Sequence, residues 1–270
     1  MILLTALPRT GKSTAIKKIV NMLGKDNCGG FYTEEIREDG ERVGFRICTL
    51  SGKTGILSHV NIESNYRISR YGVDLEAFER LCISELENAV KDNNVKYIVI
   101  DEIGPMQLFS EKYKALLISL LNCDKPIIGT IFMNPYEWLD DFKKQKNVNL
   151  IEITFDNRDS LPLQLVELLS KNDEQFQRKI AKAKRYSTGL DRFELLEDKI
   201  IIHSEHGTRT IKKDTDKYVC DCEFYQTNYT CSHIMAIINL NLSFNNENSK
   251  QKIIKRSWSK WMKIRIILTG

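Results

Sequence analysis

The chain has 270 residues and a net charge of +4, with 42% hydrophobic and 28% charged residues. These fractions are ordinary for a soluble protein, and no apolar run is long enough to span a bilayer. Met1 leads directly into an apolar, strand-like segment, which is not the pattern of a secretory signal peptide. The composition therefore predicts a cytoplasmic protein with one large or two modest domains.

Charge is distributed unevenly along the chain. Residues 1–170 contain 21 basic and 24 acidic residues, whereas residues 171–270 contain 19 and 12. The acidic first part and the basic second part indicate two structural units. The second unit is the better suited of the two to a polyanionic partner.

The first fourteen residues have the pattern of a short strand, a tight loop and the start of an amphipathic helix. The loop and the helix start have the sequence Ala6-Leu7-Pro8-Arg9-Thr10-Gly11-Lys12-Ser13-Thr14. This is the layout of a Walker A loop, in which backbone N–H groups and a helix N-terminus bind nucleotide phosphates. Lys12 would contact the β- and γ-phosphates, and the Ser13 hydroxyl would bind Mg²⁺. The alternative is a chance Gly-Lys-Ser in an ordinary strand–loop–helix.

A second strand-like segment, residues 96–104, is apolar until it ends in Asp101-Glu102-Ile103-Gly104. A continuous apolar run is typical of a strand buried on both faces of a parallel sheet, and ligands bind at the carboxyl ends of such strands. We therefore interpret it as a Walker B segment, in which Asp101 holds Mg²⁺ and Glu102 activates the attacking water. The alternative is a helix-capping pair of acids after a core strand.

The segments between and after these motifs alternate between strand and helix patterns. We expect a β-meander over 31–60, helices over 73–93, 110–121, 135–142 and 161–169, and strands over 126–132 and 148–155. Asp74 is the expected N-cap of the first of these helices. The alternation predicts an α/β fold with a mostly parallel sheet and right-handed crossovers. Thr130 is either a γ-phosphate contact or an ordinary strand threonine.

Several segments of residues 1–170 resemble the small P-loop nucleoside-triphosphatase family, whose members include thermophilic archaeal enzymes and a human cancer-related one. They occur in family order, at residues 8–14, 30–37 with 42–45, 70–74, 101–106 and 157–159. The resemblance implies a RecA-like sheet extended by the meander. It also implies Mg²⁺-dependent hydrolysis of ATP, GTP and other nucleoside triphosphates, with nucleotide and metal contacts from residues 11–14 and 101–104.

The chain departs from the family pattern at two loop positions, where Ala6 and Arg9 replace glycine. Glycine in such a loop often supplies a positive φ or a close backbone approach to phosphate. Ala6 adds only a methyl group, whereas Arg9 either compensates with its charge or partly blocks the loop. Three further arginines are either stabilisers of transition-state charge or solvated surface residues. These are Arg67, Arg70 and Arg158.

The pattern changes after a connecting helix expected over residues 171–186. In residues 187–243 we expect short strands over 199–203, 208–213 and 218–219, and then an apolar helix. Four metal-binding side chains fall within fourteen residues: Cys220, Cys222, Cys231 and His233. Three thiolates and one imidazole are the ligand set of a closed tetrahedral zinc site, which is structural rather than catalytic. His203 and His206 are expected to be ordinary strand or turn residues.

A β-hairpin followed by Cys-x-Cys and by Cys-x-His on a helix resembles the SWIM zinc finger. The resemblance implies a small ββα domain that binds DNA or another protein. The tail, residues 244–270, interleaves basic residues with Trp258 and Trp261. Such a tail can bind DNA or RNA, lie on a membrane or dock on the protein itself, and we favour nucleic acid.

Two functions remain open at this point. The first is an Mg²⁺-dependent nucleoside triphosphatase whose zinc module binds nucleic acid or a protein partner. The second is a nucleotide-binding adaptor or regulator, in which the changes at Ala6 and Arg9 have weakened or abolished turnover.

Overall fold

The computed structural model describes residues 1–214 and 217–242. The chain divides into two compact units, Met1–Leu169 and Ser170–Gly270. The predicted linker and basic tail, residues 243–270, lie outside the described residues. Of the helices that are described, none combines the length and the apolar character that a membrane span requires.

A nine-stranded sheet forms the centre of the first unit. Its strands are β1 (Ile2–Thr5), β2 (Cys28–Glu38), β3 (Glu41–Thr49), β4 (Thr54–His59), β5 (Arg67–Ile68), β6 (Tyr71–Val73), β7 (Tyr97–Ile103), β8 (Ile127–Ile131) and β9 (Asn149–Glu152). They are arranged in the order β5-β6-β4-β3-β2-β7-β8-β1-β9. The five strands from β2 to β9 in this order are parallel neighbours, and the β3–β6 extension is antiparallel. The predicted α/β fold, with a mostly parallel sheet and a meander at its edge, is confirmed.

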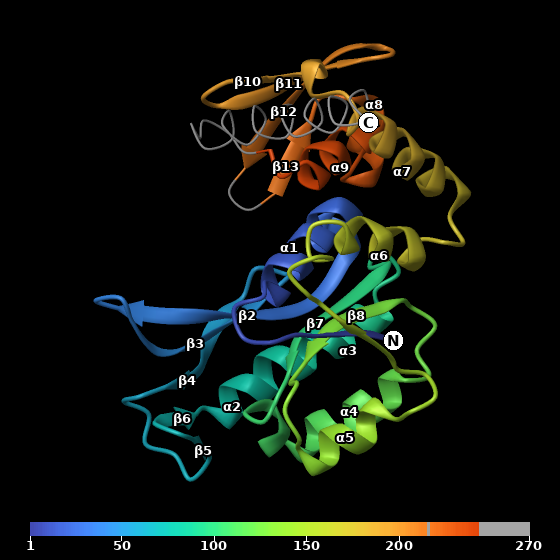
Figure 1. The fold of residues 1–270 in the computed structure, drawn as a ribbon. Helices are drawn as coiled ribbons and strands as arrows, with labels where there is room; N and C mark the ends of the chain where they lie inside the picture. Colours follow the sequence, from blue (N-terminus) through green and yellow to red (C-terminus); the bar gives the residue numbers. More distant parts are fainter. Residues whose placement is uncertain (215–216, 243–270) are drawn as a thin grey trace, which may run out of the picture. The chain divides into compact units, whose positions relative to one another are not determined.

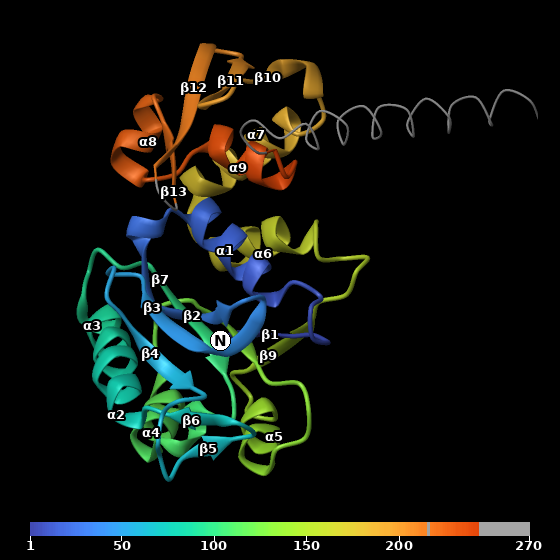
Figure 2. The same cartoon turned by 90° about the vertical axis from the view of Figure 1, so that its left-hand side faces the viewer.

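Helices cover both faces of this sheet. They are α1 (Lys12–Leu23), α2 (Leu75–Phe78), α3 (Ser84–Lys91), α4 (Glu111–Leu120), α5 (Glu137–Lys143) and α6 (Leu161–Leu169). Figure 1 shows α1 and α6 on one face and α3, α4 and α5 on the other, and Figure 2 shows the same layers from the side. On the face covered by α3, α4 and α5, the rings of Phe31, Phe78 and Tyr113 pack together in the buried core. The ring centroids of Phe78 and Tyr113 lie 5.0 Å apart.

The order of the parallel strands decides where the functional motifs meet. β8 lies between β1 and β7, so the carboxyl ends of these three strands are side by side at one edge. The loop after β1 and the acidic end of β7 therefore lie at the edge where open α/β sheets bind ligands.

Some elements differ from the sequence expectation. The helix predicted over 73–93 consists of α2, a π-helical segment Glu79–Ile83 and α3. The π-helical segment could not be predicted, because a single widened turn does not disturb the spacing of apolar residues enough to be recognised. The predicted N-cap of the helix is confirmed, since the Asp74 carboxylate accepts from Ala77 N at 2.8 Å. The strand predicted over 148–155 ends at Glu152, because Asn157 folds the chain back by bonding Thr154 N and Glu152 O. The two- and three-residue strands β5 and β6 were too short to predict.

The described part of the second unit, residues 170–214 and 217–242, contains an α-helix, a small sheet and two further α-helices. The elements are α7 (Glu174–Tyr186), β10 (Phe193–Leu195), β11 (Lys199–Ser204), β12 (Gly207–Asp214), β13 (Lys217–Cys220), α8 (Glu223–Asn228) and α9 (Ser232–Asn239). The strands form an antiparallel sheet in chain order. The buried side of α7, which includes Phe176, Ile180 and Tyr186, packs against α9. The expected helix and strands are present, whereas β10 and α8 have no clear sequence pattern.

Gly30 on β2 provides a test of this packing. Its φ is 118°, and a Cβ atom would lie 2.0 Å from the carbonyl oxygen of Val99 on β7. We expect Gly30→Ala to lower the free energy of unfolding by at least about 3 kcal/mol, because both the backbone and the strand pair must shift. Urea unfolding followed by circular dichroism measures this loss.

Gly40→Ala is the matched control, because Gly40 also has a positive φ, 84°, but a Cβ there would meet no atom within 4 Å. Only the conformational cost of about 1 kcal/mol is expected at Gly40. Equal losses in the two variants would contradict the close approach of β2 to β7.

Candidate functional site

The loop between β1 and α1 forms the first part of the site. Thr10 N donates to Leu7 O at 3.3 Å, and Ala15 N donates to Gly11 O at 2.9 Å, so the chain turns sharply into α1. The first turn of α1 has no acidic residue, and no side chain caps its N-terminus at Gly11. The backbone N–H groups at this end of α1 are therefore open to an anionic ligand.

The two departures from the glycine pattern have different structural consequences. Ala6 is 1% exposed and lies outside the left-handed region of φ. Arg9 is exposed and has a φ of 64°, a conformation that costs a residue with a Cβ atom about 1 kcal/mol. The cost of departing from glycine therefore falls on Arg9.

Lys12 and Glu102 join the loop to the end of β7. Lys12 is the first residue of α1, and its Nζ lies 3.1 Å from Oε1 of Glu102. The two side chains are 20% and 29% exposed, so the ion pair is partly shielded from water. This contact places the lysine of the predicted Walker A loop beside the carboxylate predicted to activate water.

Asp101 is the most buried member of the site, at 3% exposure. Its Oδ1 accepts a hydrogen bond from the Thr130 hydroxyl on β8. Its Oδ2 is buried and has no hydrogen-bond partner among residues 1–214 and 217–242. A buried carboxylate oxygen without a partner is costly, which makes this atom a natural ligand for a cation.

The electrostatic environment of Asp101 agrees with this interpretation. Burial raises the pKa of Asp101 to about 6, and the neighbouring Glu102 carboxylate acts in the same direction. The hydrogen bond from Thr130 and the nearby Ser13 hydroxyl act in the opposite direction on this pKa. The Ser13 hydroxyl and the Asp101 carboxylate therefore lie together, and oxygen ligands of this kind fit Mg²⁺.

The remaining predicted nucleotide contacts fall into two groups. Leu7, Pro8, Ser13 and Thr14 are exposed, whereas Thr10 is buried and its hydroxyl has no partner among the described residues. Ile103 points into the core, and its carbonyl accepts from Phe132 N at 3.0 Å, so its side chain is not available to a ligand. Gly104 is buried where the chain leaves β7.

For Thr130 and for Arg67, Arg70 and Arg158, the sequence leaves open whether they belong to the functional site or are ordinary structural and surface residues. Thr130 is fully buried and positions Asp101. Arg67 donates to the carbonyls of Ile62 and Arg70, and the Arg158 guanidinium lies 4.9 Å from the Phe155 ring centre. Arg70 lines a cavity that also touches Glu102. Only the three-dimensional neighbours of these residues distinguish their roles.

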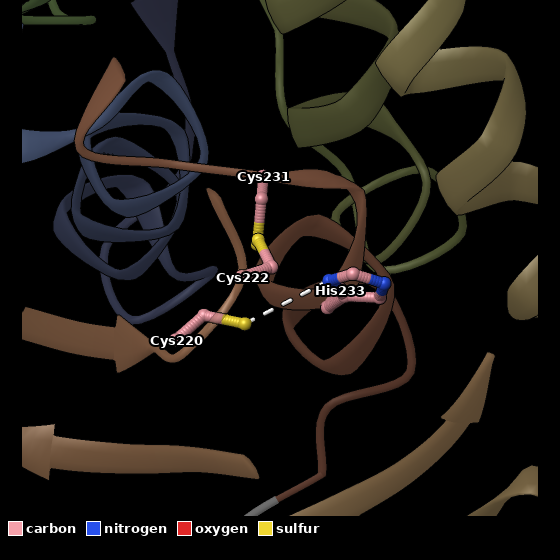
Figure 3. Close-up of side chains that lie close together, drawn as sticks. All are labelled: Cys220, Cys222, Cys231 and His233. Carbon is pink, nitrogen blue, oxygen red and sulfur yellow. Dashed lines mark hydrogen bonds between the residues drawn. The ribbon is translucent and has the colours of Figure 1, made fainter. Parts of the chain in front are cut away.

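A second cluster lies within the second unit and brings together the four predicted zinc ligands. Their ligand atoms all lie within 4.8 Å of one another, and all four residues are buried. Figure 3 shows the three sulfur atoms and the imidazole facing one another. Cys220 ends β13, Cys222 and Cys231 are the N-caps of α8 and α9, and His233 lies in the first turn of α9.

The chemistry of this cluster fits a metal ion. Cys220 Sγ lies 3.7 Å from His233 Nδ1, and the Tyr186 ring stacks on the imidazole at a centroid distance of 5.6 Å. Hydrogen bonds from Cys220 and Cys231 lower the pKa of Cys222, while the hydrogen bond with Cys222 raises the pKa of Cys220 and burial raises that of Cys231. Without a metal ion, the thiolate is therefore favoured at Cys222 alone among the three. The donor set is that of a closed zinc site. His203, in contrast, pairs with Glu194 at 2.7 Å on the surface.

Comparisons with known proteins identify the first unit. A family model described as NTPase matches residues 1–166. Nucleoside-triphosphatase THEP1 from Thermotoga sp. (strain RQ2) is 38% identical over 171 residues, which cover 63% of this chain and 96% of that protein. The cancer-related nucleoside-triphosphatase of Homo sapiens is 36% identical over 173 residues, which cover 59% and 91%.

Solved structures give the same result. The crystal structure of THEP1 from the hyperthermophile Aquifex aeolicus matches with a TM-score of 0.56 and 37% identity, over 63% of this chain and 99% of that one. The solution structure of a human cancer-related nucleoside triphosphatase matches with a TM-score of 0.55 and 34% identity, over 63% and 97%. Since the family model covers more than half of the chain and these relatives are matched over nearly their whole length, the chain belongs to the NTPase family of enzymes.

Proposed function

We propose that the first unit hydrolyses nucleoside triphosphates, ATP and GTP among them, to diphosphate and phosphate in an Mg²⁺-dependent reaction. The observation that carries this proposal is the 3.1 Å contact between Lys12 and Glu102, beside the unpartnered oxygen of Asp101. The relatives named nucleoside-triphosphatase support the same reaction. Broad base specificity is part of the proposal, since the phosphate-binding residues recognise the part that all nucleoside triphosphates share.

Each side chain has a role that follows from its position. Backbone N–H groups of residues 11–14 bind the phosphates at the start of α1. Lys12 exchanges its contact with Glu102 for the β- and γ-phosphates, which leaves the Glu102 carboxylate free to accept a proton from water. Ser13 and Asp101 would hold Mg²⁺, which supplies positive charge to the phosphate oxygens when it is bound.

Lys12 and Glu102 are separable in this scheme. We expect Lys12→Ala to lower kcat/KM for ATP by at least about 100-fold, because a charge that stabilises the transition state is lost. Glu102→Gln should lower kcat by about 100-fold or more while nucleotide binding is retained, because only proton transfer is removed. Phosphate release and equilibrium binding of a fluorescent ATP analogue measure the two effects.

Lys17→Ala is the control, because Lys17 lies on the same helix but pairs with Glu34 at the surface. It should hydrolyse ATP as the wild type does. Undiminished hydrolysis by Glu102→Gln would refute the role of Glu102, and undiminished hydrolysis by Lys12→Ala would refute the site.

The left-handed conformation of Arg9 supports one alternative function, a nucleotide-binding adaptor with weakened turnover, because Arg9 strains the loop where the family has glycine. We expect Arg9→Gly to change kcat by less than about tenfold, because relief of about 1 kcal/mol of backbone strain corresponds to at most that factor. Steady-state phosphate release measures the change, with Ala6→Gly as the matched control in the same loop. A larger gain confined to Arg9→Gly would favour the adaptor.

We further propose that the second unit binds one structural Zn²⁺ through its Cys₃His cluster, as a SWIM-type module over residues 187–243. The module would bind DNA or RNA, with a protein as the alternative partner. Support comes from a cavity of about 470 Å³ that Cys222, Cys231 and His233 help to line, and from the basic segments on either side of the module. Residues 187–243 contain 6 basic and 9 acidic residues, so the excess of positive charge lies in residues 171–186 and 244–270. Lys179, Lys182 and Arg209 line the cavity, and Lys179 Nζ lies 4.2 Å from the centre of the Phe224 ring, a combination that suits phosphates and stacked bases.

Removal of one ligand tests the zinc proposal. Cys222→Ser should lose most of its zinc and unfold the second unit, because the binding energy of a structural zinc is folding energy. Elemental analysis should give one zinc per wild-type chain, and amide hydrogen exchange reports the unfolding. Cys123→Ser is the control, since Cys123 belongs to the first unit and is not one of the four clustered side chains.

A Cys222→Ser protein that keeps both its zinc and its protected amides would refute the metal site. For the partner, oligonucleotide binding should weaken steeply as salt rises. Binding that does not respond to salt would argue against phosphate contacts and for a protein partner.

A further inference from the structure

The first unit contains a cavity of about 570 Å³ beside the candidate site. Its wall is formed by the end of β7 and the loop after it, by Phe132 after β8, and by the β3–β6 extension. None of residues 6–14, all of which the structure describes, contributes to this wall. Glu102 does contribute, so this carboxylate has the phosphate loop on one side and the cavity on the other.

Two arginines and a tyrosine form the basic side of the cavity. Arg42 Nε and Arg70 Nε both donate to the Tyr71 hydroxyl oxygen, at 3.1 and 3.4 Å, and the hydroxyl donates to Arg42 O at 3.2 Å. The guanidinium groups also lie 5.7 and 5.5 Å from the centre of the Tyr71 ring. Tyr71 therefore fixes both arginines in the wall.

This arrangement favours negative charge inside the cavity. Hydrogen bonds from Arg42 and Arg70 lower the pKa of Tyr71, because the two cations stabilise its ionised form. Glu35 and Glu41 pair with the arginines from outside, and neither acid lines the wall. Each guanidinium has more N–H donors than these contacts use, so donors remain for an anionic ligand.

Gln107 is a second, independent indication of a ligand. It lines the cavity, and the residue as a whole is only 5% exposed. Its side-chain amide offers both a donor and an acceptor at the wall. A ligand with both a donor and an acceptor on one edge would satisfy this amide.

Most of the rest of the wall is apolar, with Thr33 and Ser69 as its other polar side chains. Phe45, Met106 and Phe132 are partly buried, and Leu57 is 1% exposed. Such surfaces favour a flat, weakly hydrated body over a flexible polar one. The volume lies within the range of pockets that hold small ligands.

We propose that this cavity binds a small molecule with a planar, hydrogen-bonding ring and one phosphate group, a mononucleotide-like ligand, next to Glu102. The phosphate contacts Arg42 and Arg70, the edge of the ring bonds the Gln107 amide, and the ring lies against the apolar wall. If the proposed hydrolysis is correct, the bound ligand also contacts the carboxylate that activates water, so its concentration would regulate turnover.

Isothermal titration of the full chain tests this proposal. The phosphate loop is first saturated with ADP and Mg²⁺, and AMP, GMP, CMP and UMP are then titrated separately. We expect at least one of them to bind at a single site with a Kd below about 1 mM. Inorganic phosphate and the matching nucleoside should each bind at least about tenfold more weakly, since each offers only part of the contacts.

Variants locate the binding. Arg70→Ala should weaken the monophosphate and inorganic phosphate alike by at least about tenfold, whereas Gln107→Leu should weaken only the monophosphate. Arg46→Ala is the control, because Arg46 lies on β3 outside the wall. Arg70→Lys replaces Arg70→Ala if the latter does not fold, and it should also weaken binding because the fixed guanidinium fork is lost.

Failure of all four monophosphates to bind at concentrations of about 5 mM, well above the expected Kd, would overturn the proposal. Equal binding by the wild type, Arg70→Ala and Gln107→Leu would also overturn it. The proposed hydrolysis fails on a different result, the undiminished turnover of Lys12→Ala, so the two failures are distinguishable.

Discussion

The contact between Lys12 and Glu102 is the interaction on which the functional site depends. It joins residues 90 positions apart, one at the start of α1 and one at the end of β7. It forms because β8 holds β1 and β7 in one parallel sheet, so that both segments leave the sheet at the same edge. Without nucleotide, each charge neutralises the other in a partly shielded position. In the proposed reaction, a nucleoside triphosphate offers Lys12 a more highly charged partner, and the exchange would release the Glu102 carboxylate for catalysis. Nucleotide binding and activation of the base would therefore be coupled through one ion pair.

Asp101 adds a second constraint of the same kind. Its carboxylate is buried, one oxygen is held by Thr130, and the other has no partner among the residues described. Burial raises its pKa to about 6, so the ionised form is costly until a cation offsets the desolvation. If Mg²⁺ binds as proposed, the fold holds one of its ligands in place in advance, at some cost in stability. The proposed zinc site is similar, because four buried donor atoms within 4.8 Å of one another would be stabilised by a shared ion.

The sequence predicts those parts of the fold and site in which the functional residues lie close together in the chain and next to a recognisable strand or helix pattern. The phosphate loop, the apolar β7 ending in Asp101 and Glu102, and the close spacing of Cys220 and Cys222 are all short-range signals. The role of Thr130 could not be predicted, because it depends on the neighbouring position of β8 and β7. Arg42, Arg70 and Gln107 come from separate segments that the β3–β6 extension brings together, and β5 and β6 are too short to leave a periodic pattern. What remained hidden therefore depends on strand order and register rather than on residue type.

The most direct measurement of the central claim is a crystal structure of the full chain with Mg²⁺ and a non-hydrolysable ATP analogue. We predict that Lys12 Nζ leaves Glu102 and contacts the β- and γ-phosphates. The metal should lie against Ser13 and Asp101 Oδ2, and Glu102 should face a water molecule near the γ-phosphate. An analogue bound away from the loop after β1, with the contact between Lys12 and Glu102 intact, would contradict this prediction.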